Sequence, residues 1–129
     1  MRKPVTRLNY DPIAATYDRR YHENRLPGVS AALTDLVHMY PDQPVLEVGC
    51  GTGHWLAGLD GKRNPVWGLD SSRGMLSQAH KQAPGARLGR ATARQLPYAN
   101  DSFGVIFCVN ALHHFDQPQA FLTEAWRAL

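Results

Sequence analysis

Long hydrophobic runs are absent from this sequence of 129 residues. No apolar stretch approaches the ~20 residues that a membrane-spanning helix requires, and the basic N-terminus lacks the continuous apolar core of a secretory signal. Hydrophobic residues make up 43% of the chain and charged residues 19%, which is typical of a globular domain and excludes a disordered chain. We therefore expect a soluble cytoplasmic protein without a membrane partner.

Cysteine is also scarce. Cys50 and Cys108 are the only two, they form no Cys-x-x-Cys pair, and each lies in or beside an apolar segment. Zinc sites and disulfide-exchange sites need closely spaced ligands, so the sequence favours neither. We expect two reduced, partly buried thiols and no metal ion.

Acidic residues are rare in the middle of the chain. From Lys62 to Arg94 there are seven Lys and Arg residues and a single acid, Asp70, and the net charge of the whole chain is +3. A basic face can attract an anionic substrate or nucleic acid. These basic residues are scattered, without a run or interleaved aromatic side chains, which favours a solvated surface. We expect no nucleic-acid partner.

What is present is an alternation of helix-like and strand-like segments. Apolar spacing and end signals predict helices over 11–21, 26–40, 54–59 and 116–129 and after Ser71, with strands over 44–48, 65–69, 86–89 and 103–109. Such alternation implies parallel strands joined by right-handed crossovers. The sequence predicts an α/β fold with a doubly wound parallel sheet.

A glycine-rich turn follows the first predicted strand, in the stretch VLEVGCGTGHW, Val45–Trp55, with Glu47 just before it. Glycine allows positive φ and brings backbone N–H groups close to a ligand, and ligands of such sheets bind at the carboxyl ends of the strands. Asp70 ends the second strand, where an acid accepts hydrogen bonds from ribose hydroxyls. Together these features predict a nucleoside-containing ligand.

The glycine spacing separates two cofactor classes. The dinucleotide fingerprint G-x-G-x-x-G would need a glycine where His54 stands, and the sequence has G-x-G-x-G instead. Glu47 beside the turn is unfavourable for a pyrophosphate and suits a cation, such as the ammonium or sulfonium of S-adenosylmethionine. An NAD-dependent oxidoreductase is therefore the disfavoured alternative.

Four motifs in order carry a family resemblance. EVGCGTG, GLD at 68–70, LPYANDSF and VNALHHF are similar to the successive motifs of class I S-adenosylmethionine-dependent methyltransferases of the small-molecule type, over residues 10–129. The resemblance implies a Rossmann-like sheet with strand order 3-2-1-4. It also implies S-adenosyl-L-methionine as cofactor, S-adenosyl-L-homocysteine as product and a small-molecule methyl acceptor.

The resemblance also implies a set of cofactor-binding residues. In it Asp70 holds the ribose diol, the glycine turn approaches the methionine and ribose portions, and Tyr17 closes over the cofactor as a lid. Thr92 stands where the family usually has an acid, so the adenine contact is expected to be weaker than the ribose contact. The full set is Tyr17, Glu47, Gly49, Cys50, Gly51, Asp70, Ser71, Met75, Thr92, Ala93, Asn110 and Ala111.

A catalytic cluster is not evident. His113 and His114 follow the strongest predicted strand, and either is a candidate base, although packing or substrate lining is the favoured interpretation. The sulfonium already activates the methyl group, so alignment of a nucleophile can supply most of the catalysis. A dedicated base is therefore optional.

The number of strands departs from the family, whose sheet usually has seven. We expect about four here, with residues 1–129 forming a single, partial, apparently truncated domain flanked by a helical lid over 1–40. The strand near Val105 would then be an open edge, which could pair with another copy of the chain. The alternative function is accordingly a truncated, non-catalytic module for cofactor binding or dimerisation.

Overall fold

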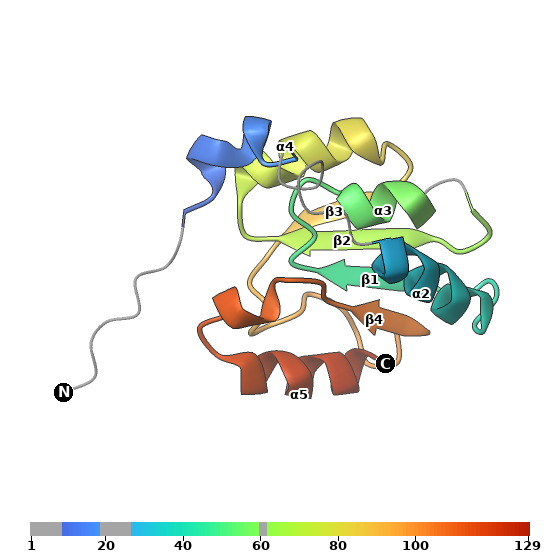
Figure 1. Cartoon of the computed structure of the whole chain (residues 1–129). Helices are drawn as coiled ribbons and strands as arrows, with labels where there is room; N and C mark the ends of the chain where they lie inside the picture. The colour runs from blue at the N-terminus through green and yellow to red at the C-terminus, as the bar shows by residue number, and fades with distance from the viewer. Residues whose placement is uncertain (1–8, 19–26, 60–61) are drawn as a thin grey trace.

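A four-stranded parallel sheet forms the centre of the molecule (Figure 1). The computed structural model describes residues 9–18, 27–59 and 62–129. The strand order is β3-β2-β1-β4, so the predicted order 3-2-1-4 is confirmed. The strands are β1 (Val45–Val48), β2 (Val66–Asp70), β3 (Arg87–Arg90) and β4 (Val105–Phe107).

Strand β1 is the most deeply buried element of the sheet. All four of its residues are buried, and Val45 pairs in parallel with Val66 on one side and Val105 on the other. A strand with neighbours on both edges and helices on both faces must be apolar throughout. Glu47 is the one exception within β1, and it lies at the carboxyl end, where the sheet meets the site described below.

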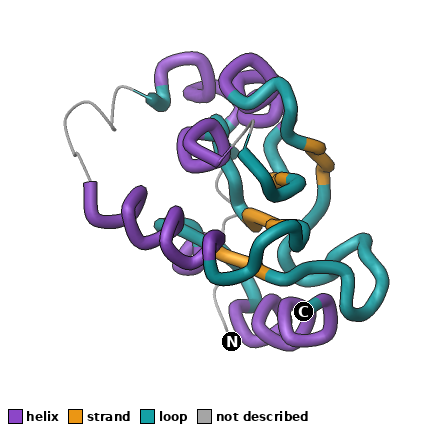
Figure 2. Tube along the Cα trace, turned by 90° about the vertical axis from the view of Figure 1, so that its right-hand side faces the viewer, coloured by secondary structure: helices purple, strands orange, loops and turns teal. Residues whose placement is uncertain are grey.

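Helices cover both faces of the sheet (Figure 2), and the sheet separates two clusters of buried side chains. On one face, Val45, Val66 and Val105 pack with side chains of α2 (Pro27–His38) and α3 (His54–Leu59), and α4 (Arg73–Gln82) lies beside them. On the other face, Leu46 and Leu69 pack under α5 (Pro118–Ala128). The sheet is therefore doubly wound, as predicted. No helix in the described ranges is long and apolar enough to cross a membrane.

Strand β4 is shorter than the predicted strand over 103–109. The backbone N–H of Phe103 donates to the carbonyl of Ala128 at 3.0 Å, so Phe103 is tied to the end of α5 and packs under that helix. Beyond Phe107 the chain leaves the sheet, and Asn110 has φ of 54°. Within the described part of the chain, β4 pairs only with β1, so its outer edge is open.

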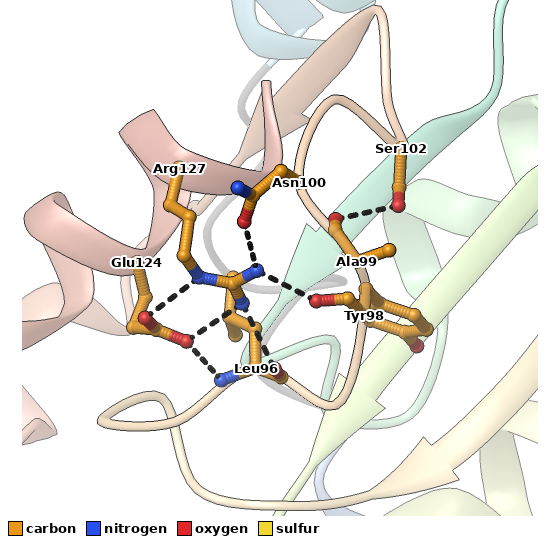
Figure 3. Close-up of polar contacts among 7 residues, drawn as sticks. All are labelled: Leu96, Tyr98, Ala99, Asn100, Ser102, Glu124 and Arg127. Carbon is orange, nitrogen blue, oxygen red and sulfur yellow. Dashed lines mark hydrogen bonds and ion pairs between the residues drawn. The ribbon is translucent and has the colours of Figure 1, made fainter.

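A polar cluster fastens α5 to the loop before β4 (Figure 3). The Arg127 guanidinium donates to the carbonyls of Tyr98 (2.8 Å) and Leu96 (3.2 Å), and it pairs with Glu124 at 2.9 Å. Glu124 in turn accepts from the backbone N–H of Leu96 at 2.8 Å. These contacts satisfy backbone groups of a loop that has no sheet partner.

Three predicted helix ends are corrected by the structure. The N-cap of α4 is Ser72, whose hydroxyl accepts from the Met75 N–H at 3.1 Å, and not Ser71. The first helix is a 3₁₀ helix, η1 (Asp11–Thr16), that starts after Tyr10, and residue 21 lies outside the described residues. Helix α5 follows Gln117 and not Asp116.

Candidate active site

A cavity of about 460 Å³ opens at the carboxyl ends of the strands. Its wall includes the turns that follow β1, β2 and β4 and the segment that follows β3. Tyr10 and Tyr17, on either side of η1, complete it. This is the place where a parallel α/β sheet is expected to bind ligands.

The three glycines after β1 serve two different purposes. All have positive φ: 75° at Gly49, 55° at Gly51 and 81° at Gly53. A Cβ on Gly49 would lie 2.7 Å from the Cβ of Ala111, and a Cβ on Gly53 would lie 3.0 Å from the backbone of Ala79 in α4. A Cβ on Gly51 would meet no atom within 4 Å. Two glycines therefore permit close packing of the turn, while Gly51 leaves space at the cavity wall.

Glu47 is a buried acid on the cavity wall. Its side chain is 1% exposed, and its Oε1 atom has no hydrogen-bond partner among the described residues. Burial raises the pKa of the Glu47 carboxyl well above its ordinary value of 4.5, and the nearby charge of Asp70 raises it further. A buried oxygen that lacks a partner costs free energy unless a ligand satisfies it.

Asp70 joins the first two turns of the site. Its Oδ2 accepts from the Gly51 N–H and its Oδ1 from the Ser72 N–H, both at 2.9 Å. Burial raises the pKa of the Asp70 carboxyl, while the N–H donors oppose that shift and the charge of Asp11 adds to it. Each carboxylate oxygen can accept more than one hydrogen bond, so Asp70 retains capacity for ligand hydroxyls.

All twelve residues of the predicted cofactor set line this one cavity. The structure thus brings together positions from five separate segments of the chain. His113 and His114 also line it, on the short 3₁₀ helix η2 (Leu112–His114), and both are exposed.

The sequence did not single out several other wall residues. Tyr10 packs edge-to-face against His114 (ring centroids 5.4 Å apart) and against Tyr17 (6.0 Å), and Trp55, Phe115 and Gln117 also line the cavity. The feature of the sequence that could have predicted Phe115 and Gln117 as wall residues is their position shortly after the two histidines. Tyr10 carries no such signal, because it meets the site only through tertiary packing.

The charges of the wall favour a cationic ligand. Glu47 and Asp70 both face the cavity, and no Lys or Arg of the described residues lines it. Asp116 at the wall is paired with Arg94 at 3.5 Å, which leaves the two inner acids without a basic partner there. The described residues contain no cluster of three or more His, Cys, Asp or Glu side chains suited to a metal ion. The site therefore fits a ligand with an ammonium or sulfonium group and ribose hydroxyls.

Comparison with known proteins identifies the family of this chain. Residues 45–129 match a family described as "Methyltransferase domain". The chain is 35% identical to the malonyl-[acyl-carrier protein] O-methyltransferase of Laribacter hongkongensis, across 98% of this chain and 47% of that protein. It is 32% identical to the trans-aconitate 2-methyltransferase of Deinococcus radiodurans, across 85% of this chain and 43% of that protein.

Solved structures agree with this relationship. An S-adenosylmethionine-dependent methyltransferase from Thermotoga maritima superposes with a TM-score of 0.74 at 27% identity, covering 93% of this chain and 55% of that chain. The YcgJ protein of Bacillus subtilis gives 0.68 at 27% identity, covering 79% of this chain and 46% of that chain. The chain spans less than half the length of the curated relatives described above. By fold, motifs and family match, it belongs to the class I S-adenosylmethionine-dependent methyltransferases.

Proposed function

We propose that this protein binds S-adenosylmethionine and transfers its methyl group to a small-molecule acceptor. The observation that carries the proposal is the pair of acids, Glu47 and Asp70, in a cavity whose described wall has no basic side chain except the two histidines. The unpartnered Oε1 of Glu47 suits the cofactor's ammonium group, and Asp70 suits the ribose diol. When bound, the cofactor supplies a methyl group activated by positively charged sulfur.

The chain's own residues would bind the cofactor, orient the acceptor and exclude water from the site. We assign the methionine and ribose portions to the glycine turn with Glu47 and Asp70. We assign the adenine to Ser71, Met75, Thr92 and Ala93, and the far side of the methionine portion to Asn110 and Ala111. Holding the acceptor in line with the methyl group is the main catalytic task, because proximity and orientation supply much of the barrier reduction. The acceptor would enter on the side of Tyr10, His113 and His114.

The acceptor class is proposed only as a small molecule. Relatives are named for different acceptors: malonyl-[acyl-carrier protein], trans-aconitate and demethylmenaquinone. His113 and His114 line the cavity on the proposed acceptor side, where an imidazole would take a proton from a hydroxyl or amine acceptor. An acceptor that is already an anion would need no base.

Calorimetric titration with S-adenosylhomocysteine tests this proposal. We expect binding by the wild type and binding weakened at least about ten-fold in Asp70→Ala, because a charge-assisted hydrogen bond is lost. NADH serves as the control ligand. Binding of NADH in place of S-adenosylhomocysteine would contradict the proposal.

A second candidate is a non-catalytic module that binds the cofactor or associates with another copy. The open outer edge of β4 in the described chain favours it, as does an exposed apolar stripe on α5 and its C-cap residue. The stripe consists of Leu122, Trp126 and Leu129, which are 54%, 83% and 46% exposed. Under this candidate, residues 1–129 still form one partial methyltransferase domain with 1–40 as its flank, but it binds without turnover.

A further inference from the structure

Two aspartates near the N-terminus reach two turns of the cavity wall that are distant in sequence. The Asp11 carboxylate accepts from the Ser72 hydroxyl and, at 2.8 Å, from the Gly74 N–H, so it meets the turn after β2. The Asp18 carboxylate accepts from the Thr52 hydroxyl in the turn after β1 and from the side-chain amide of Gln82 at the end of α4. We call residues 11–18 the strap.

The hydroxyl groups that these aspartates accept from are buried. Thr52 is 1% exposed and Ser72 is 6% exposed, and they belong to the small set of buried polar residues in the described chain. A buried hydroxyl that loses its partner costs free energy, whereas one that donates to a carboxylate makes one of the stronger hydrogen bonds in proteins. The two aspartates therefore fix the conformation of both turns.

Hydrogen bonds and a small apolar contact together hold the strap in place. Ala14 is the only buried apolar side chain of the strap, and it packs against Gly74, where an added Cβ would come within 3.1 Å of the Ala14 Cβ. Ile13 is 39% exposed. Figure 1 shows η1, in blue, lying beside α4. Tyr17 also packs against Tyr10, and the two carboxylate anchors are the contacts that tie the strap to the two turns.

The Asp11 anchor acts on a residue that also holds Asp70, and the Asp18 anchor acts on the neighbour of one. The Ser72 N–H donates to Asp70 Oδ1 while the Ser72 hydroxyl donates to Asp11. Thr52 follows Gly51, whose N–H donates to Asp70 Oδ2. The strap thus supports the Gly51 and Ser72 N–H groups that orient Asp70, the residue proposed to bind the ribose. It also carries Tyr17 to the cavity wall.

We infer that Asp11 and Asp18 are positioning residues of the cofactor site, which lock its two turns and hold the strap across them. The inference rests on the proposed function only for the identity of the ligand. Neither aspartate lines the cavity, so their effect on binding passes through Ser72, Thr52 and the strap.

The test combines two readouts on Asp11→Ala and Asp18→Ala. Hydrogen exchange in the ligand-free protein measures the opening of the strap amides. These include the Ile13 N–H, which donates to the Tyr10 carbonyl, and the Tyr17 N–H, which donates to the Ala14 carbonyl. Calorimetry gives the affinity for S-adenosylhomocysteine at a temperature where each variant is folded. We expect faster strap exchange and an affinity roughly ten-fold lower in each alanine variant. A residue that only stabilised the fold would lower the melting temperature and leave this affinity unchanged.

Asparagine variants separate hydrogen bonding from charge. Asp11 accepts both of its hydrogen bonds with Oδ1, so Asp11→Asn keeps a neutral oxygen for them and should restore most of the wild-type exchange and affinity. Asp18 uses both oxygens, one for Thr52 and one for Gln82, so Asp18→Asn should recover only part of the loss. Asp35→Ala, at an exposed position on α2, is the matched control and should match the wild type.

Two results would overturn the inference. One is wild-type exchange and affinity in both alanine variants; the other is an Asp11→Asn variant as impaired as Asp11→Ala. If Asp18→Ala does not fold, Thr52→Val removes the same hydrogen bond from the opposite partner and decides the question. Failure of the wild type to bind S-adenosylhomocysteine would contradict the proposed function, while the exchange readout would still test the anchors.

Discussion

Glu47 is a carboxylic acid in a strand where an apolar side chain would stabilise the sheet more. It is the only charged residue of β1, it is buried, and its Oε1 has no partner among the described residues. Buried acids without a partner lower stability, and they persist where a site needs them. Glu47 lies at the cavity wall, where the ammonium group of a ligand would donate to its Oε1 atom.

Glu47→Gln should therefore raise the stability of the ligand-free protein at neutral pH. Burial raises the pKa of Glu47, so the folded state holds its proton more tightly than the unfolded chain. Stability consequently falls as pH rises from the ordinary value of 4.5 toward the raised pKa, by at most about 1.4 kcal/mol per pH unit. Denaturant unfolding across this pH range should show that slope in the wild type and in an Asp35→Asn control. An equal fall of the unfolding free energy with pH in Glu47→Gln would show that Glu47 is not the group responsible.

Gly49 and Gly58 form a matched pair of positions for alanine. A Cβ on Gly49 would meet Ala111 at 2.7 Å, with φ at 75°, so Gly49→Ala should lower the free energy of unfolding by roughly 1–3 kcal/mol and weaken cofactor binding. A Cβ on Gly58, in α3, would meet no atom within 4 Å, so Gly58→Ala should be neutral or slightly stabilising. Thermal unfolding of both variants checks this contrast. Equal losses would mean that backbone conformation at Gly49 is not the cause.

At the scale of elements, most helices and strands follow from the sequence because apolar spacing reflects burial directly. The strand over 103–109 is the instructive exception. Phe103 is as apolar as the strand residues, but it is buried under α5 with Tyr98 and Trp67, at ring distances of 4.9 and 6.1 Å, and outside the sheet. Apolar composition indicates burial and cannot distinguish a strand from a loop packed beneath a helix.

The same limit applies to parts of the site. The glycine turn and Asp70 could be predicted because their roles depend on local spacing at strand ends. The anchoring roles of Asp11 and Asp18 could not, because their hydroxyl partners lie 61 and 34 positions away in the chain. Asp11 before proline reads as a helix cap, and only tertiary structure brings it to α4.

The cluster around Arg127 gives a prediction for an element. Arg127→Ala removes the donors that hold the carbonyls of Leu96 and Tyr98, so the loop before β4 should loosen and the melting temperature should fall (Figure 3). Exchange of amides over 94–103 should become faster in the same variant. Gln119→Ala, at an exposed position on α5, is the control. An unchanged exchange rate in this loop would show that apolar packing of Phe103 alone holds it.

At the scale of the whole molecule, self-association would use the edge of β4 that is open within the described residues. If two copies meet through this region, the mass from light scattering should rise with protein concentration. Trp126→Asp should abolish the rise, because the charge would lie in an apolar contact from a side chain that is 83% exposed. Gln119→Asp on the same helix should not. A constant monomer mass in the wild type would remove the dimerisation candidate.

The central claim is that the buried acid of the cavity recognises the positive charge of a nucleoside cofactor. The most direct measurement compares the calorimetric affinities of S-adenosylhomocysteine and 5′-methylthioadenosine, which keeps the adenosine and lacks the ammonium group. We predict that the wild type prefers S-adenosylhomocysteine by at least about ten-fold and that Glu47→Gln loses most of this preference. Equal affinities in the wild type, or a preference unchanged by Glu47→Gln, would contradict the account.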